Sequence, residues 1–135
     1  MKPLSFSSFI EKYRNCHEKR IDKLLIFKFE GCIAQSKSEK SCDYAIAVQD
    51  EQQLFLIECK DGKVSLRDFD QGIKQLENSI EIIRKEFKAV PDLAVLCYGK
   101  LDHLVLVRLR YIKKLRYNVR FAAKRLAEKY CIACK

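Results

Sequence analysis

Apolar residues in the middle of the chain fall into two short runs that predict a pair of strands. The runs are Tyr44–Val48 and Leu54–Ile57, and the polar segment QDEQQ separates them. Two such runs around a polar turn are typical of an antiparallel hairpin. A turn centred between residues 50 and 51 places Asp43 opposite Glu58, with Lys60 on the same face as Glu58. A slip of one residue in this register would move Asp43 to the other face of the sheet.

Three longer stretches have the periodicity of amphipathic helices, at residues 7–25, 65–87 and 116–131. The first contains Ser8 and Glu11 at the spacing of a capping box. The second follows a polar start at Ser65, and its apolar residues recur every three or four positions. They are Leu66, Phe69, Ile73, Leu76, Ile80, Ile83 and Phe87.

Three further segments have the composition of strands, at residues 26–35, 93–99 and 103–112. The resulting order is α-β-β-β-α-β, followed by one more strand and a basic helix. Mixed strands and helices in this order predict an α/β fold with a mixed sheet flanked by helices. We expect a single domain over residues 1–135, with a core at about 8–98 and a basic C-terminal extension at about 104–135.

The composition is that of a globular protein, with 48% hydrophobic and 33% charged residues among 135. No apolar run reaches the roughly 20 residues that a membrane helix needs, and charged residues interrupt the N-terminal segment where a signal peptide would be apolar. We therefore expect a cytoplasmic, intracellular protein with no membrane partner. Its seven cysteines are then expected to be free thiols that pack as small apolar side chains. Cys131 and Cys134 have the spacing of half a zinc site, and a metal or iron–sulfur role for them is the less favoured alternative.

Positive charge is concentrated at the C-terminal end of the chain. Residues 1–107 hold equal numbers of basic and acidic side chains, so the net charge of +9 belongs to residues 108–135. Such a patch predicts a polyanionic partner, with nucleic acid ahead of a membrane surface; a solvated basic helix is the alternative. The residues expected to contact phosphates are Arg108, Arg110, Lys113, Lys114, Arg116, Arg120 and Lys124.

The hairpin end has the chemistry of a metal site. Two carboxylates about 5 Å apart repel each other unless a positive charge lies between them. Mg²⁺ or Mn²⁺ would bind the oxygens of Asp43 and Glu58, and the backbone carbonyl of Cys59 would add a third. Lys60 would then orient or deprotonate a water molecule for attack on a phosphodiester. The alternative is a solvent-facing ion pair between Lys60 and the two acids.

Asp43, followed by Glu58-Cys59-Lys60 within an α-β-β-β-α-β order, resembles the PD-(D/E)xK nuclease superfamily over residues 8–98. That superfamily includes restriction enzymes and the archaeal Holliday junction resolvases. The resemblance implies a restriction-endonuclease-like fold and metal-dependent phosphodiester hydrolysis. It makes Asp43 and Glu58 metal ligands and Lys60 the catalytic residue that positions water. The sequence departs from the family pattern at Cys42, where a proline usually precedes the aspartate.

Two further positions match residues found in many members. An acid on the first helix corresponds to Glu11 or Glu18; the alternative roles are the capping box for Glu11 and a surface position on the helix for Glu18. A glutamine on the helix after the motif corresponds to Gln75 or Gln71, which would otherwise be the polar flank of an amphipathic helix.

These features predict a metal-dependent nuclease, with DNA ahead of RNA as its substrate. A structure-specific endonuclease and a homodimer are the forms considered first, while exo- or endonuclease action and the oligomeric state stay open. Two other functions compete with it. The chain could have a nuclease fold that binds nucleic acid without cutting it, or it could be a small basic RNA-binding protein whose acids decorate the surface.

Overall fold

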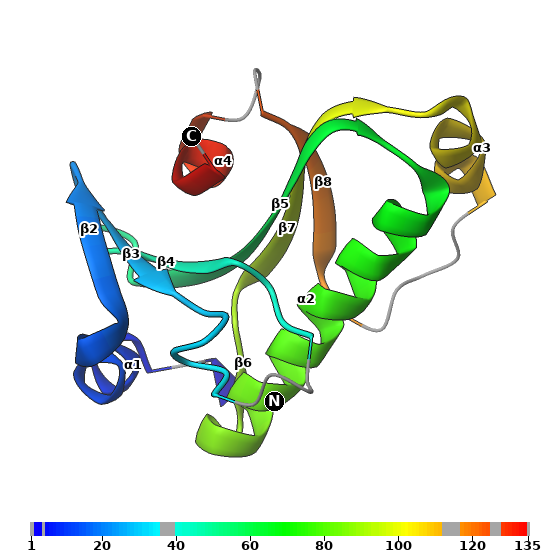
Figure 1. The fold of residues 1–135 in the computed structure, drawn as a ribbon. Helices are drawn as coiled ribbons and strands as arrows, with labels where there is room; N and C mark the ends of the chain where they lie inside the picture. The colour runs from blue at the N-terminus through cyan, green and yellow to red at the C-terminus, as the bar shows by residue number, and fades with distance from the viewer. Residues whose placement is uncertain (1, 4, 36–39, 112–116, 125–127, 135) are drawn as a thin grey trace.

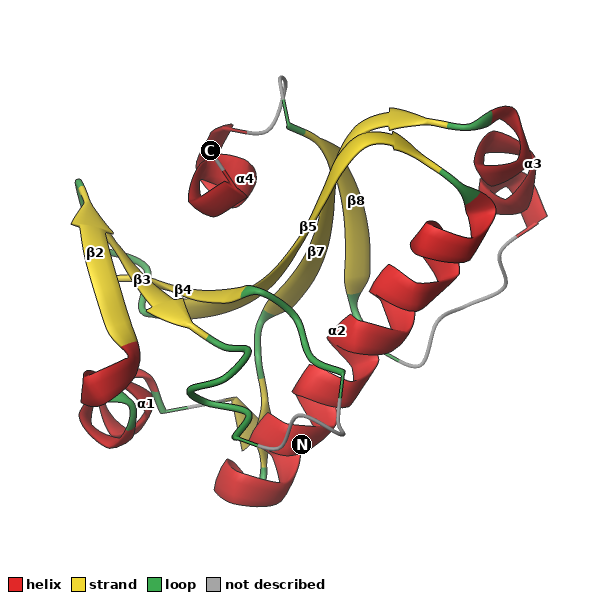
Figure 2. Cartoon of the chain, viewed as in Figure 1, coloured by secondary structure: helices red, strands yellow, loops and turns green. Residues whose placement is uncertain are grey.

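The fold is built on a six-stranded mixed sheet, and its α/β class agrees with the expectation (Figures 1 and 2). The structure is a computed structural model that describes residues 2–3, 5–35, 40–111, 117–124 and 128–134. The strand order is β2-β3-β4-β5-β7-β8; neighbours from β2 to β5 are antiparallel, and β5, β7 and β8 are parallel. These strands are β2 (His17–Ile21), β3 (Leu24–Lys28), β4 (Tyr44–Val48), β5 (Gln53–Val64), β7 (Leu93–Leu101) and β8 (Val119–Ala123). Two short strands, β1 (Lys2–Pro3) and β6 (Ala89–Val90), form a separate parallel pair.

Helices lie on both sides of the sheet. They are α1 (Phe6–Lys12), α2 (Leu66–Phe87), α3 (His103–Tyr111) and α4 (Glu128–Cys131), with the 3-10 turns η1 (Arg14–Cys16) and η2 (Ile132–Cys134). Helices α1 and α2 cover one face, whereas α4 lies against the other, concave face (Figure 1). None of the helices in the described ranges is long and apolar enough to cross a membrane.

The β4–β5 hairpin has the predicted register. Tyr44 pairs with Ile57, and Val48 pairs with Gln53. Even-numbered residues of β5 such as Leu56 face α2, and odd-numbered ones such as Phe55 belong to the core cluster on the other face. The alternation is that of an extended strand, and it sends Glu58 and Lys60 toward α2.

Helix α2 forms over the predicted residues, with Ser65 as its N-cap and the predicted apolar stripe on its buried side. The side chain of Ser65 accepts a hydrogen bond from the Asp68 backbone N–H at 3.2 Å, which satisfies one of the free donors at the helix start. The helix ends before Lys88, whose φ of 57° is left-handed. Five residues of the predicted stripe are buried against the sheet: Phe69, Ile73, Leu76, Ile80 and Ile83.

The predicted N-terminal helix is wrong beyond its first turns. Helix α1 begins after Ser5, so Ser8 lies inside it and does not form the expected capping box. Residues 17–21 form β2, an exposed strand that pairs with β3 through a turn at Asp22. Pairing with the edge of β3 satisfies these backbone groups, and tertiary context of this kind overrides a helical pattern.

The predicted C-terminal strand and helix exchange places. Residues 103–111 are helix α3, which begins where Asp102 accepts hydrogen bonds from the N–H groups of Leu104, Val105 and Leu106. Residues 119–123 are β8, which pairs with the free edge of β7. An unpaired strand edge offers a full row of backbone partners, and this stabilises a strand in a segment with helical spacing.

The expectation of free thiols is also wrong. Three disulfides join Cys16 to Cys32, Cys59 to Cys134 and Cys97 to Cys131, and only Cys42 is a free, buried thiol among the described cysteines. Disulfides persist mainly in oxidising surroundings. They therefore weigh against the expected cytoplasmic location, which stays a prediction.

Candidate active site

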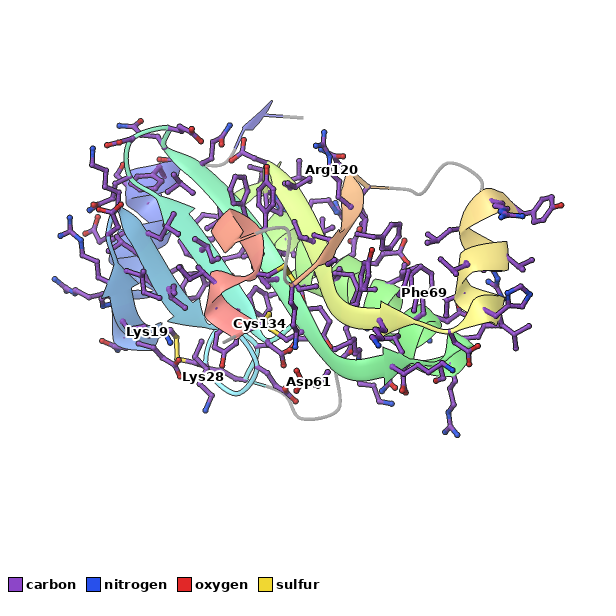
Figure 3. All side chains as sticks on the ribbon, turned by 90° about the horizontal axis from the view of Figure 1, so that it is seen from above. Lys19, Lys28, Asp61, Phe69, Arg120 and Cys134 are labelled. Carbon is purple, nitrogen blue, oxygen red and sulfur yellow. A yellow bond between two sulfur atoms is a disulfide. The ribbon has the colours of Figure 1, made fainter. Side chains whose placement is uncertain are left out.

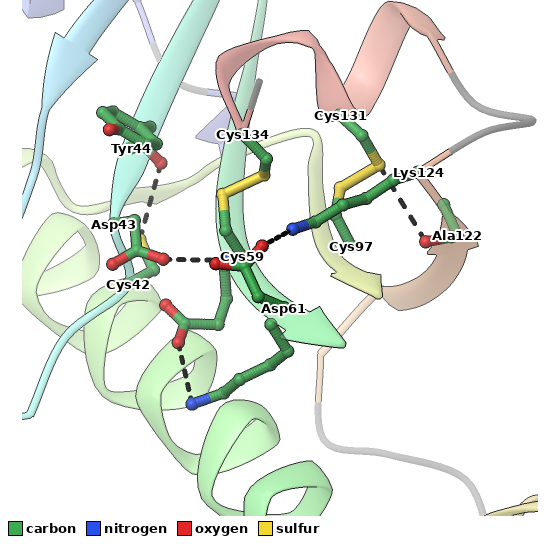
Figure 4. The surroundings of a disulfide bond; sticks show 12 residues. Cys42, Asp43, Tyr44, Cys59, Asp61, Cys97, Ala122, Lys124, Cys131 and Cys134 are labelled. Atoms are coloured by element: carbon green, nitrogen blue, oxygen red, sulfur yellow. Dashed lines mark hydrogen bonds and ion pairs between the residues drawn. A yellow bond between two sulfur atoms is a disulfide. The ribbon is translucent and has the colours of Figure 1, made fainter. Parts of the chain in front are cut away.

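The start of β4 and the middle of β5 bring Asp43 beside Glu58. The Asp43 backbone N–H donates to the carbonyl of Ile57 at 3.1 Å, and Asp43 Oδ2 accepts from the Cys59 N–H at 2.8 Å. The first contact fixes the backbone of Asp43 against β5, and the second fixes its carboxylate. Figure 4 shows the Asp43 side chain reaching the strand at Cys59. The predicted proximity of Asp43 and Glu58 is confirmed, because Tyr44 pairs with Ile57 in the predicted register and the charge of Asp43 acts on Glu58.

Glu58 is a buried acid with an unsatisfied oxygen. Its residue surface is 2% exposed, so the alternative of a solvent-facing ion pair does not hold. Its Oε2 lies 3.2 Å from Lys60 Nζ, whereas its buried Oε1 has no N–H or O–H donor beside it. Burial, followed by the charge of Asp43, raises the pKa of Glu58 to about 8, and Lys60 offsets only part of this. A protonated Glu58 can donate a hydrogen bond to the Asp43 carboxylate, and this bond also raises the pKa of Glu58. A buried carboxylate oxygen without a donor is costly unless a cation or a proton binds there.

Gln75 connects Lys60 to the segment before Asp43. Lys60 Nζ donates to Gln75 Oε1 at 3.0 Å, and Gln75 Nε2 donates to the carbonyl of Ser41 at 3.2 Å. The structure therefore brings Gln75 of α2 to the site, as predicted. Gln71, one helical turn earlier on α2, lines an adjoining cavity together with Gln75. Lys60 is held between an acid and an amide, which fixes its ammonium group next to the carboxylates.

Two small residues of α2 also shape the site, and the sequence analysis missed both. Ser79 Oγ accepts from the Cys42 N–H at 2.8 Å and donates to the Gln75 carbonyl at 2.8 Å. A Cβ on Gly72 would lie 2.8 Å from Leu96 Cδ1 and 3.2 Å from Lys60 Cε, so this glycine lets the helix approach Lys60. Their signal was present, since both are small residues on the buried side of a strongly apolar stripe.

We expect Ser79→Ala to lower the free energy of unfolding by about 1–2 kcal/mol, because the buried Cys42 N–H would lose its partner. Urea denaturation followed by circular dichroism measures this loss. The matched control is Asn78→Ala, which removes an exposed hydrogen bond to the Lys40 carbonyl in the same segment and should cost less. Equal losses in the two variants would contradict a special role for Ser79.

The donors fit a hard divalent cation, although the carboxylate set is small. Asp43 and Glu58 offer oxygens, and Cys59 offers its backbone carbonyl. In an extended residue the N–H and the carbonyl point to the same edge of the strand, and the Cys59 N–H points toward Asp43, so its carbonyl does as well. Within the residues that the structure describes, no group of three or more His, Cys, Asp and Glu side chains is placed to hold a metal ion. Solvent would complete the coordination, as is usual for Mg²⁺.

The candidates for a supporting acid remain open. Glu11 is exposed on α1. Glu18 is exposed on strand β2 and not on a helix. The pKa of Tyr44 is raised mainly by its own burial, and to a lesser extent by the charges of Glu18 and Asp43. Strand β3 lies between Glu18 on β2 and the start of β4, and the role of Glu18, like that of Glu11, stays a prediction.

Comparison with known proteins adds no relative: no protein-family model, curated protein or solved structure matches this chain. The resemblance to the PD-(D/E)xK superfamily thus rests on Asp43, Glu58 and Lys60 as they stand here.

The basic residues predicted to contact nucleic acid do not form one helical stripe. Arg108 lies on α3 with Nη1 3.4 Å from Asp70 Oδ1, and Lys124, just after β8, forms an ion pair with Asp61. Arg110 is exposed on α3, and Arg120 is exposed on β8, at the edge of the molecule in Figure 3. Lys113, Lys114 and Arg116 lie outside the described residues. Two of the described cations are thus already paired.

A second set of basic side chains lines a cavity of about 780 Å³ on α2. Gln75 also lines this cavity, and because Lys60 donates a hydrogen bond to Gln75, the cavity adjoins the candidate site. The exposed cations are Lys40, Arg67, Lys74 and Lys85, with Asp70 and Glu81 as the acids. This arrangement places positive charge next to the candidate site.

Proposed function

We propose that the protein is a nuclease that hydrolyses the phosphodiester backbone of DNA with Mg²⁺ or Mn²⁺. The observation that supports the proposal is the pair of acidic side chains, Asp43 and the buried Glu58, whose Oε1 has no N–H or O–H donor. An acid with no function at the end of a strand is normally exposed to solvent, because burying a carboxylate without partners is costly, whereas Glu58 is buried. The choice of DNA over RNA comes from the resemblance to the PD-(D/E)xK superfamily.

Each side chain has a task in this reaction. Asp43 and Glu58 would hold the cation, which when bound supplies a Lewis acid that activates water and offsets phosphate charge. Lys60, fixed by Glu58 and Gln75, would orient the attacking water toward phosphorus. Gln75 acts through Lys60 and is a positioning residue. Among the described residues, these four side chains are the ones to which the proposal assigns a role in hydrolysis.

The cavity on α2 is where we expect the phosphate backbone to bind. Lys74 and Arg67 are exposed in its lining, and phosphate contacts of this kind give affinity that falls with salt. We predict that Lys74→Gln combined with Arg67→Gln weakens DNA binding and reduces the slope of log K against log salt by about 2. Fluorescence anisotropy at several salt concentrations measures the slope.

The matched control replaces Lys63 and Lys100 by glutamine. These exposed lysines are paired in the β5–β7 register and do not line the cavity. A reduction of the slope that is as large in the control would contradict the placement of DNA at this cavity.

One observation favours a second candidate, a nuclease-fold protein that binds nucleic acid without cutting it. No third acidic side chain joins Asp43 and Glu58 within the described ranges. An incomplete ligand set lowers metal affinity and would leave a binding surface without catalysis. The predicted homodimer also stays a proposal; the exposed apolar side chains Leu104, Leu106 and Tyr111 on α3 offer one surface for it.

The test is a cleavage assay on single-stranded, duplex and four-way-junction DNA, with a matching RNA strand, in Mg²⁺, Mn²⁺ or EDTA. We expect DNA to be cut with metal and not with EDTA, and the preferred substrate defines the specificity. If every substrate is bound in a salt-dependent way and none is cut, the second candidate replaces the first.

A further inference from the structure

Residues 128–134, which comprise α4 and η2, form a C-terminal cover over the concave face of the sheet. Seen from above, the cover crosses the strands, with Cys134 over them (Figure 3). Cys131 and Ala133 are buried in the core cluster of this face, and the Tyr130 ring packs edge-on against Phe55 with 5.3 Å between centroids. The cover thus contributes to burying an apolar surface that α1 and α2 do not reach. The sheet side chains in that cluster are Ile26, Ile46, Val48, Phe55, Ile57, Leu93, Val95 and Cys97.

Two parallel disulfides fasten the cover to neighbouring strands. Cys134 is bonded to Cys59 on β5, and Cys131 is bonded to Cys97 on β7 (Figure 4). Cys59 and Cys97 are direct partners in the β5–β7 register. Helical segments of four and three residues are too short to persist on their own hydrogen bonds. The covalent bonds and the packing against the sheet therefore hold the cover in place.

The two disulfides differ in their access to solvent. Cys97 and Cys131 are 0% exposed, whereas Cys59 and Cys134 are partly exposed. Exchange requires a thiolate to approach a disulfide sulfur, so access limits the rate. A reductant in solution will reach the Cys59–Cys134 bond first, and it will reach Cys97–Cys131 only after the cover has loosened.

We propose that the Cys59–Cys134 and Cys97–Cys131 pairs form a redox-controlled latch, which a dithiol reductant opens in that order to release the C-terminal cover. In each step one thiolate of the reductant attacks one sulfur of a protein disulfide, which breaks the protein S–S bond, expels the other protein sulfur as the first thiolate and forms a mixed disulfide. The second thiolate of the reductant then attacks the reductant's own sulfur in the mixed disulfide, releases the second protein thiolate and closes a cyclic disulfide. Two electrons pass to each protein disulfide, and two thiols are left on the protein.

The latch is a property of the fold and does not rest on nuclease activity. It does lie on the same strand segment as the site, because Cys59 stands between Glu58 and Lys60 and its N–H holds Asp43 Oδ2. The two disulfide bonds lie on the face of the sheet opposite α2. The latch and the candidate site therefore share strand β5, but their side chains lie on opposite faces of the sheet.

The experiment treats the oxidised full-length chain with graded dithiothreitol, alkylates the free thiols and maps them by mass spectrometry. A parallel sample reports exposed apolar surface through bis-ANS fluorescence. We expect Cys59 and Cys134 to be alkylated at least about tenfold faster than Cys97 and Cys131, because only the first pair is accessible. The fluorescence should rise severalfold as the second bond opens.

Two variants separate the latch from general reduction. The double variant Cys16→Ser, Cys32→Ser lacks the remaining disulfide and should keep the ordered response. Cys134→Ser starts with the first bond already absent, so its Cys97–Cys131 bond should be reduced faster than in the wild type. Reduction of Cys97–Cys131 first, or full reduction without a rise in bis-ANS fluorescence, would overturn the proposal. The wild-type result stands by itself if either variant fails to fold.

Discussion

Asp43→Asn should abolish metal-dependent cleavage, with a loss of about 10³-fold or more, equivalent to about 4 kcal/mol of transition-state stabilisation. The substitution removes one of the two carboxylates that would hold the cation. It keeps the shape of the side chain, so the amide oxygen can still accept the Cys59 N–H at the position of Oδ2. The fold and DNA binding should therefore survive, and activity alone should fall. Single-turnover cleavage with excess enzyme measures the loss.

The control for this variant is Asp50→Asn at the other end of the same hairpin. Asp50 forms an exposed ion pair with Lys23 at 2.8 Å, so its loss should leave cleavage unchanged. Lys60→Ala and Lys63→Ala make a second comparison on β5, with loss expected only for Lys60. Equal cleavage by wild type and Asp43→Asn would rule out a role for the carboxylate pair.

Glu58→Gln should stabilise the metal-free protein relative to the wild type at high pH, by about 5 kcal/mol near pH 9. The pKa of Glu58 rises from 4.5 to about 8 on folding. Below pH 4.5 the carboxyl is protonated in both states. Between the two pKa values only the unfolded chain gives up the proton, so the stability of the wild type falls as the pH rises through this window. Glutamine carries no charge and avoids this fall.

Urea denaturation at pH 5 and pH 9 in EDTA measures the effect as the difference between wild type and variant. The difference should be small at pH 5 and large at pH 9. Glu30→Gln, at an exposed position after β3, should show no such pH dependence. If the Glu58→Gln difference is the same at both pH values, Glu58 is not a buried acid with a raised pKa.

The elements that the sequence predicted well are those in which local pattern and tertiary contacts agree. The β4–β5 hairpin alternates sides as its register requires, and α2 has both its Ser65 cap and an apolar stripe. The opposition of Asp43 and Glu58 followed from that register. The approach of Gln75 to Lys60 followed from helical spacing together with the family resemblance.

The two ends of the chain were predicted less well because long-range pairing decides them. The N-terminal helical pattern continues to residue 25, yet residues 17–21 form a strand because they pair with β3. Residues 119–123 also have helical spacing, yet they form a strand because they pair with β7. Disulfide partners such as Cys59 and Cys134 are far apart in sequence, and spacing alone does not determine connectivity. The small size of Gly72 and Ser79 on the buried side of α2 was visible in the sequence, but their contacts with Lys60 and Cys42 depend on how closely α2 approaches the sheet, which the sequence pattern does not contain.

The most direct test of the central claim, that Asp43 and Glu58 bind a divalent cation, is calorimetric titration of Mn²⁺ into the oxidised protein at pH 7. Performed in two buffers of different ionisation enthalpy, it also counts released protons. We predict one ion per chain and release of close to one proton, because a Glu58 with a pKa of about 8 is mostly protonated before the ion binds. The binding should be lost in Asp43→Asn. No heat of binding at millimolar Mn²⁺, or equal binding by Asp43→Asn, would contradict the claim.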